Sequence, residues 1–218
     1  MAHALCSVVL DADGLAAFTH QHDALRTAPM PVVITPHAGE LAMLMGLDRS
    51  EVLRDPVASA RHAAATLQVI VVLKGGPTVI ATPAGIAYVN PTGNAGMATA
   101  GSGDVLAGMI GALLAQRCSP LDAALCAVYL HGRAGDIAAR MLTEAGVVAG
   151  DIVAVRQHID RGREATFQAF QDRRKPIAGC SGTGLADTSA EREIACHGAS
   201  SKKGGDGMWD LACPALDQ

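Results

Sequence analysis

Residues 90–104 read NPTGNAGMATAGSGD and lie directly ahead of residues 105–117, a segment with helical length and apolar spacing. Glycines at this density let the backbone approach a ligand closely, because they carry no side chain. The N–H groups at the start of a helix have no partner within the helix and bind anions. We therefore interpret this segment as a loop that holds phosphate groups against a helix N-terminus.

Other interpretations of this segment stay open on its residues alone. Gly-Ser-Gly ahead of a helix is common in ordinary turns and caps. Neither the P-loop nor the dinucleotide-binding fingerprint fits, because no Lys-Ser or Lys-Thr pair closes the loop and the glycines have other spacings. The carboxylate of Asp104 would either stabilise the start of the helix or take a proton from an acceptor hydroxyl during phosphoryl transfer.

The flanking sequence predicts alternating strands and helices. Short β-branched runs that end in polar loops predict buried strands, and cap residues followed by Pro, or a final Gly, predict helix ends. We expect strands at 7–10, 31–35 and 69–73, a β-hairpin of 78–82 with 86–89, and helices at 40–45, 56–67, 101–117 and 120–142. This order predicts an α/β fold whose mostly parallel sheet has an antiparallel edge.

Two further Gly- or Pro-rich loops follow predicted strands. Lys74-Gly75-Gly76-Pro77-Thr78 follows the strand at 69–73, and Thr35 to Glu40 follows the strand at 31–35. Open α/β sheets bind ligands beyond the carboxyl ends of their strands, so these loops and residues 90–104 should converge on one crevice that fits an adenine nucleotide. The alternatives are an ordinary Gly-Gly turn with a solvated Lys74, and a capping or packed His37.

Composition and charge exclude several classes of protein. The chain has 218 residues, half of them hydrophobic but only 3% aromatic, which suits helices packed on a parallel sheet. A formal net charge of −4 gives no basic field, so we expect no nucleic-acid partner. No run approaches the roughly 18 apolar residues that span a bilayer, and no signal peptide is evident, so we expect no membrane association and a cytoplasmic location. The six cysteines show no zinc-ligand spacing.

Four segments resemble, in order and spacing, the NAD(P)H-hydrate dehydratase family of the ribokinase-like superfamily: TPHAGE at 35–40, VVLKGGPTVI at 71–80, NPTGNAGMATAGSGDVLAGMIGALLAQ at 90–116 and YLHGRAGDIAA at 129–139. VVLDADGL at 8–15 is similar to the strand and loop that precede them in the family. The resemblance covers residues 7–155. It implies a ribokinase-like three-layer α/β/α fold with a mostly parallel central sheet and a β-hairpin edge.

The resemblance also implies a site and a reaction. The substrate-binding residues would be His37 and Asp104, the nucleotide-binding residues Lys74, Gly75, Gly76, Pro77, Thr78 and Gly103, and the anion hole Gly101, Ser102 and Gly103. Family members use ADP, or ATP in eukaryotes, with Mg²⁺, for which this sequence identifies no ligands. The hydroxyl of hydrated NAD(P)H, called NAD(P)HX, is phosphorylated by ADP to give AMP, and phosphate then leaves to restore NAD(P)H. Asp104 would be the catalytic base.

This chain differs from the family pattern in two respects. Family members have a further stretch before the strand at 8–10, so we expect a partial dehydratase domain at 1–159 that lacks the N-terminal strands. Residues 160–218 match nothing in the family, and their Gly, Ser, Ala and charge content predicts a disordered tail. Two alternatives to the dehydratase are a ribokinase-like kinase of a small alcohol, such as a vitamin precursor, and a non-catalytic nucleotide-binding remnant. Relatives assemble as homo-oligomers, so a homo-oligomeric state stays an open alternative.

Overall fold

The computed structural model describes residues 6–159 of the chain, and side chains within them as far as residue 155. The partial domain predicted at 1–159 falls almost entirely within this range. The tail predicted at 160–218 lies outside the described residues.

Within residues 6–159, five strands form one open sheet in the order β1-β2-β3-β4-β5. The first three pair in parallel: β1 (Val8–Leu10), β2 (Val32–Ile34) and β3 (Ile70–Leu73). The last two, β4 (Val79–Ala81) and β5 (Ala87–Val89), form an antiparallel hairpin that joins the sheet beside β3. The predicted hairpin edge is therefore confirmed.

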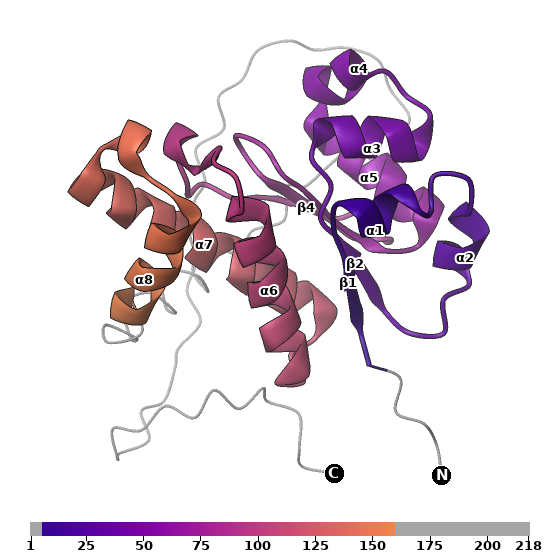
Figure 1. Ribbon diagram of the computed structural model, residues 1–218. Coiled ribbons are helices and arrows are strands. Elements are labelled where there is room, and N and C mark those ends of the chain that lie inside the picture. Colours follow the sequence, from indigo (N-terminus) through magenta and orange to yellow (C-terminus); the bar gives the residue numbers. More distant parts are fainter. Residues whose placement is uncertain (1–5, 160–218) are drawn as a thin grey trace, which may run out of the picture. The chain divides into compact units, whose positions relative to one another are not determined.

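Helices cover both faces of the sheet (Figure 1). On one face lie α1 (Asp13–Ala16), α2 (His22–Arg26), α3 (Ala38–Met45), α4 (Arg49–Arg54) and α5 (Pro56–Leu67). On the other lie α6 (Ser102–Ala115) and α7 (Pro120–Leu142). Successive strand residues point to opposite faces, so Ile34 packs with the first group of helices and Val33 with the second. This is the predicted three-layer architecture.

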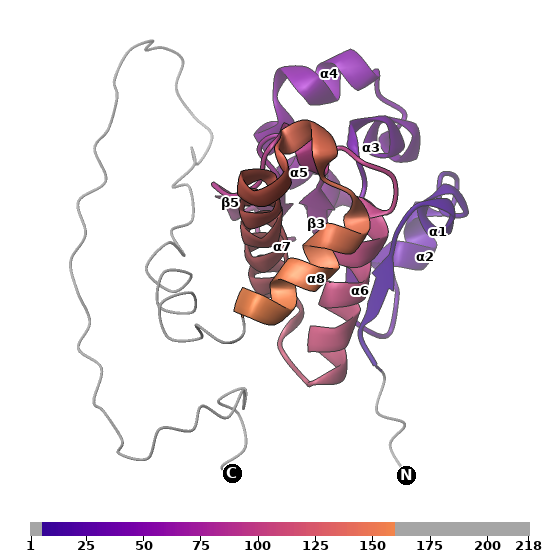
Figure 2. The ribbon, with the colours of Figure 1, turned by 60° about the vertical axis from the view of Figure 1, so that its left-hand side comes forward.

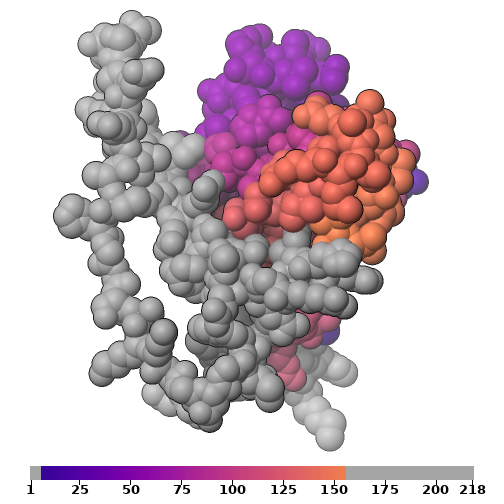
Figure 3. All heavy atoms as spheres, turned by 90° about the vertical axis from the view of Figure 1, so that its left-hand side faces the viewer, coloured from indigo at the N-terminus to yellow at the C-terminus, as the bar shows by residue number. Residues whose placement is uncertain are grey.

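The last described helix, α8 (Ala149–Ile159), lies against α7 and α6 (Figure 2). A short 3₁₀ turn, η2 (Glu144–Gly146), connects α7 to it, and a second one, η1 (Ala95–Met97), lies in the Gly-rich segment. Figure 3 shows, in orange, the surface formed by the last described residues, which are the end of α7, then η2 and α8. Among residues 6–159, no helix is both long and apolar enough to cross a membrane.

The cap residues explain where the main helices begin and end. Asp55 Oδ1 accepts a hydrogen bond of 2.9 Å from the Ala58 N–H at the start of α5, and Ser119 Oγ accepts one of 3.1 Å from the Asp122 N–H at the start of α7. Gly46 ends α3 with a φ of +66°, a conformation that glycine adopts without steric cost. These three boundaries follow the sequence prediction.

One helix start and one loop differ from the prediction. Helix α3 begins at Ala38 and not at residue 40, because the side chain of His37 caps it. Helix α6 begins at Ser102, one residue after the predicted start at 101, so its first turn includes the end of the Gly-rich segment. The polar loop expected after β1 contains α1, whose Leu15 is buried in the core.

Candidate active site at the carboxyl ends of the parallel strands

Lys74 is the centre of a group of charged side chains at one edge of the sheet. Its ammonium nitrogen lies 2.6 Å from Asp11 Oδ1 and 3.8 Å from Glu40 Oε2. These three residues follow β3, β1 and β2 respectively, and parallel strands bring their carboxyl ends to the same edge. We call Asp11, His37, Glu40 and Lys74 the Lys74 cluster.

Backbone pairing fixes the position of Lys74 relative to the loop after β2. The Lys74 N–H donates a hydrogen bond of 2.8 Å to the Pro36 carbonyl, and His37 and Lys74 form an isolated parallel bridge. The side chains of the three charged partners are largely buried, with 22% of Lys74, 13% of Asp11 and 17% of Glu40 exposed. A partly buried ion pair is weakly screened by salt, so the ammonium is held in one place.

The N-terminus of α6 approaches this cluster. A β-carbon added at Gly103 would lie 3.3 Å from Lys74 Nζ and 3.7 Å from Asp11 Oδ2, so the missing side chain leaves room beside the ammonium. Among residues 6–159, the N–H groups of Gly103 and Asp104 have no hydrogen-bond acceptor. Two unpaired N–H donors next to an ammonium group form a surface suited to an anion.

The structure places His37 at the start of α3, where it acts as a cap. Its Nδ1 accepts hydrogen bonds of 3.0 Å from the N–H groups of both Gly39 and Glu40, and the Glu40 carboxylate accepts one of 2.6 Å from the His37 N–H. Because Nδ1 is an acceptor, the proton of the neutral ring is on Nε2, which lies 3.6 Å from Glu40 Oε1. The ring is 61% exposed, so this N–H is accessible from solvent. The capping alternative for His37 is therefore what the geometry shows, and its role toward substrate stays a prediction.

Asp104 does not form the capping bond that its position suggested. It is exposed in the first turn of α6, and among residues 6–159 its carboxylate forms no hydrogen bond or ion pair. A free carboxylate beside two unpaired amides is placed to accept a proton. Its catalytic role stays a prediction.

The rest of the predicted nucleotide loop follows Lys74 into solvent. Gly75, Gly76 and Pro77 are exposed, and the peptide bond between Gly76 and Pro77 is cis. The Thr78 hydroxyl donates a hydrogen bond of 3.1 Å to the Gly75 carbonyl, which closes the turn. The loop thus presents backbone groups next to the cluster.

Most of the Gly-rich segment packs against α7 and only its end reaches the cluster. Thr92 Oγ1 lies 3.1 Å from the Tyr129 carbonyl, and the Gly93 N–H donates to the carboxylate of Asp136 at 3.2 Å. A β-carbon at Gly132 would lie 2.2 Å from Thr92 Oγ1, so this glycine allows the contact. The end of the segment reaches Lys74 at Gly103, and the phosphate contacts of Gly101 to Asp104 stay a prediction.

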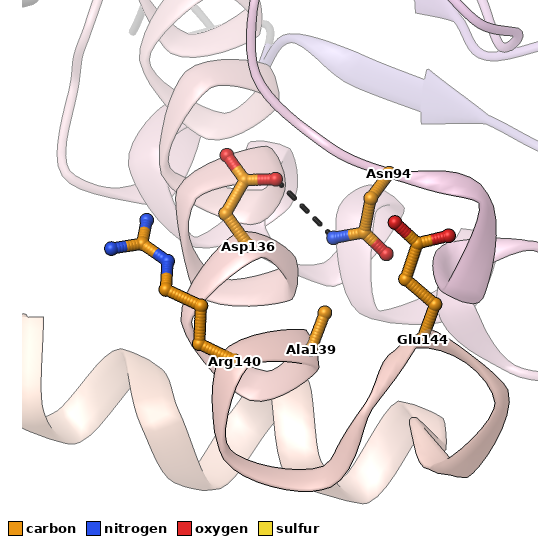
Figure 4. Close-up of a pocket in the computed structure, with 5 residues that line it drawn as sticks. All are labelled: Asn94, Asp136, Ala139, Arg140 and Glu144. Carbon is orange, nitrogen blue, oxygen red and sulfur yellow. Dashed lines mark hydrogen bonds between the residues drawn. The ribbon is translucent and has the colours of Figure 1, made fainter.

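A separate open hollow of about 280 Å³ lies at the far end of α7. Figure 4 shows the residues around it: Asn94, Asp136, Ala139, Arg140 and Glu144. Asn94 Nδ2 donates a hydrogen bond of 3.2 Å to Asp136 Oδ1 across its wall. The hollow includes none of the Lys74 cluster, where the charged groups converge.

Sequence analysis missed two residues of the cluster. Asp11 was assigned only to a polar loop, and Glu40 to the first residue of a helix. The available signal was position: Asp11 directly follows a predicted parallel strand, as Lys74 does, and Glu40 ends the loop sequence that follows the strand between them. Within the described part of the chain, no group of three or more His, Cys, Asp or Glu side chains is arranged to hold a metal ion by itself.

Comparisons with known proteins identify the family of the chain. A family model described as NAD(P)H-hydrate dehydratase matches residues 1–157. The bifunctional NAD(P)H-hydrate repair enzyme Nnr of Moorella thermoacetica is 44% identical over 162 residues, which are 74% of this chain and 31% of the relative. The ADP-dependent (S)-NAD(P)H-hydrate dehydratase of Neisseria meningitidis is 43% identical over 148 residues, which are 66% of this chain and 50% of the relative.

A solved structure shares the fold as well as the sequence. The ADP/ATP-dependent NAD(P)H-hydrate dehydratase from Bacillus subtilis, co-crystallised with ATP and Mg²⁺ and soaked with CoA, superposes with a TM-score of 0.64 at 35% identity. The match covers 76% of this chain and 57% of the Bacillus chain. The chain thus spans less than two thirds of the length of each of these relatives.

Proposed function

The chain belongs to the NAD(P)H-hydrate dehydratase family, and on that basis we propose that it binds an adenine nucleotide and takes part in the ADP-dependent repair of hydrated NAD(P)H. One observation carries the proposal: the ammonium of Lys74 lies beside Gly103, at the unpaired N–H groups that begin α6. A cation and two amide donors together complement the charge of a phosphate chain.

The proposed residues have distinct tasks. Lys74 and the backbone of Gly75 to Thr78 hold the nucleotide phosphates, while the unpaired N–H groups of Gly103 and Asp104, at the end of the predicted anion hole, receive the negative charge that develops on the transferred phosphoryl group. His37 offers its Nε2–H to the hydrated nicotinamide nucleotide. Asp104 accepts the proton of the hydrate hydroxyl.

The proposed reaction has two steps. The hydrate hydroxyl oxygen bonds to the terminal phosphorus of ADP, its proton passes to Asp104, and the bond to the bridging oxygen breaks to release AMP. The ring nitrogen then donates its electron pair as the C–O bond breaks and phosphate leaves. Loss of a proton from the adjacent ring carbon restores the double bond of NAD(P)H. Phosphorylation is required because hydroxide is a poor leaving group and phosphate is a good one.

Magnesium fits the donor set at this site. Mg²⁺ prefers oxygen ligands and is commonly held by one or two carboxylates together with substrate phosphates. Asp11 and Glu40 supply two carboxylates beside Lys74, and we propose that they hold the ion with the nucleotide. When bound, the ion neutralises charge on the phosphate oxygens.

The test has a binding arm and a turnover arm. Calorimetry with ADP and Mg²⁺ should show a saturable site, and addition of NADHX should then give reduced nicotinamide absorbance together with stoichiometric AMP. A folded sample that binds no ADP would contradict the proposal. ADP binding without turnover would leave the nucleotide-binding remnant, and transfer to a small alcohol in place of NADHX would identify a kinase.

A further inference from the structure

A buried histidine lies under the first turn of α6 and belongs to none of the roles assigned above. His131, in the middle of α7, is 8% exposed, and its Nε2 lies 3.3 Å from the hydroxyl oxygen of Ser102. Ser102 is itself 6% exposed. Burying two polar side chains costs free energy unless they pair with each other, so this hydrogen bond fixes their relative position.

Ser102 directly precedes Gly103 and Asp104, whose unpaired N–H groups belong to the proposed anion hole. It follows Gly101, whose φ of +83° turns the chain into the helix. The backbone of this turn is tied by the Ser102 N–H to the Thr99 carbonyl at 3.2 Å. The side-chain hydroxyl of Ser102 forms its hydrogen bond with His131, within the described part of the chain.

The charge state of His131 suits this place. Burial lowers its pKa to about 4, against a smaller opposing effect of a hydrogen bond with the Ser102 backbone. At neutral pH the imidazole is therefore neutral and exchanges a hydrogen bond with Ser102 without adding a buried charge. A buried histidine with only a structural role can take its hydrogen bond from any polar group in the core. His131 instead pairs with Ser102, the first residue of the helix that is proposed to receive the phosphates.

We propose that His131 is a positioning residue, which holds the Ser102 hydroxyl from beneath and so sets the direction of the Gly103 and Asp104 N–H groups toward the nucleotide phosphates. The role toward the nucleotide rests on the proposed function, whereas the contact between His131 and Ser102 does not. It extends the site from the Lys74 cluster across α6 into α7. Its effect on the reaction passes through Ser102 and not through contact with substrate.

The experiment compares two side chains of similar length at position 131. Glutamine places an amide nitrogen close to the position of Nε2 and keeps a hydrogen bond to Ser102, whereas methionine fills the same space without one. In ¹⁵N-labelled chain without ligand, His131→Met should shift the amide resonances of Gly101 to Asp104 and speed their hydrogen exchange. His131→Gln should leave these four amides near their wild-type positions. Unchanged amides in His131→Met would overturn the proposal.

A second arm measures ADP affinity by calorimetry. Losing one such hydrogen bond should weaken ADP binding by about three- to tenfold in His131→Met, with recovery in His131→Gln. If the wild-type chain binds no ADP, the proposed function fails while the amide experiment still decides the role of His131. If both variants bind like the wild type, the positioning role fails and the proposed function stands. Should His131→Met not fold, Ser102→Ala removes the same bond from the other side and should move the same amides.

Discussion

The ammonium of Lys74 lies 2.6 Å from Oδ1 of Asp11, a residue 63 positions earlier in the chain. Because both side chains are mostly shielded from water, the pair is screened less than a surface ion pair. The cation is therefore in position before any nucleotide arrives. A binding group that needs no ordering on association loses less conformational entropy when the ligand binds.

Replacing Lys74 by methionine should weaken ADP binding by about tenfold to a hundredfold, because a charge-assisted hydrogen bond contributes about 1.5–3 kcal/mol. The change also leaves Asp11 and Glu40 without their cation, so the free energy of unfolding should fall. Calorimetry measures the first effect and urea unfolding the second. Adding Asp11→Asn to the variant should recover stability without recovering affinity. Arg54→Met, which removes an exposed cation on α4, is the control and should change neither quantity.

Two glycines of α6 provide a matched pair. A β-carbon at Gly103 would meet Lys74 Nζ at 3.3 Å, whereas one at Gly108 would meet nothing within 4 Å. Alanine favours a helix interior over glycine by up to about 1 kcal/mol, so both Gly103→Ala and Gly108→Ala should keep or raise the melting temperature. Only Gly103→Ala should weaken ADP binding, by about tenfold, because its methyl group occupies the space beside the ammonium. Equal affinities in the two variants would separate Gly103 from the nucleotide site.

The fold was predictable because its signals are local. Asp55-Pro56 and Ser119-Pro120 place a cap side chain before a proline, and both helices begin there. The turn chemistry of residues 83–85 predicted the hairpin that the structure confirms. Each of these features depends on a few neighbouring residues. The strand-loop positions also indicated the edge of the sheet at which the Lys74 cluster lies.

The composition of the site was less predictable, because its contacts join distant residues. Nothing near Asp11 indicates that its carboxylate meets Lys74, since that contact depends on the pairing of three strands. The partner of His131 likewise depends on how α6 and α7 pack. The Gly-rich segment identified the family resemblance. The N–H of its Gly93, however, donates to Asp136 of α7. The spacing of the glycines alone does not distinguish such a packing contact from phosphate binding.

The low pKa of His131 predicts a specific response to acid. Burial lowers the pKa from 6.5 to about 4, so between these values the unfolded chain binds a proton that the folded chain does not. The contribution to stability is therefore complete above about pH 6.5 and is lost as the pH falls toward about 4. The loss between about pH 7.5 and about pH 5 should be about 2 kcal/mol, since one pKa unit corresponds to about 1.4 kcal/mol.

Urea unfolding of wild type and His131→Gln at the two pH values measures this loss. The acid-dependent part should shrink in His131→Gln by about 2 kcal/mol, because glutamine does not titrate. His62→Gln, a change at an exposed position of α5, is the control and should keep the wild-type pH dependence. The same pH dependence in all three proteins would show that His131 titrates normally in the folded state.

Asp104 and Asp122 occupy equivalent positions, each the third residue of its helix, α6 and α7 respectively. Replacing either by asparagine removes a negative charge that interacts with the helix dipole, an interaction that contributes about 0.3–1 kcal/mol. Only Asp104 lies beside the unpaired amides next to Lys74. If Asp104 accepts the hydroxyl proton, Asp104→Asn should lower NADHX turnover by about 10²–10⁴-fold, because asparagine is not a base.

The decisive measurement is turnover of NADHX with ADP and Mg²⁺ in wild type, Asp104→Asn and Asp122→Asn, alongside ADP affinity and melting temperature for each. Both variants should bind ADP, and the melting temperatures separate a loss of helix stability from a loss of proton transfer. Asp122→Asn should retain turnover close to wild type. Near-normal turnover in Asp104→Asn would remove Asp104 from the mechanism, and an equal loss in both variants would attribute the effect to the helices.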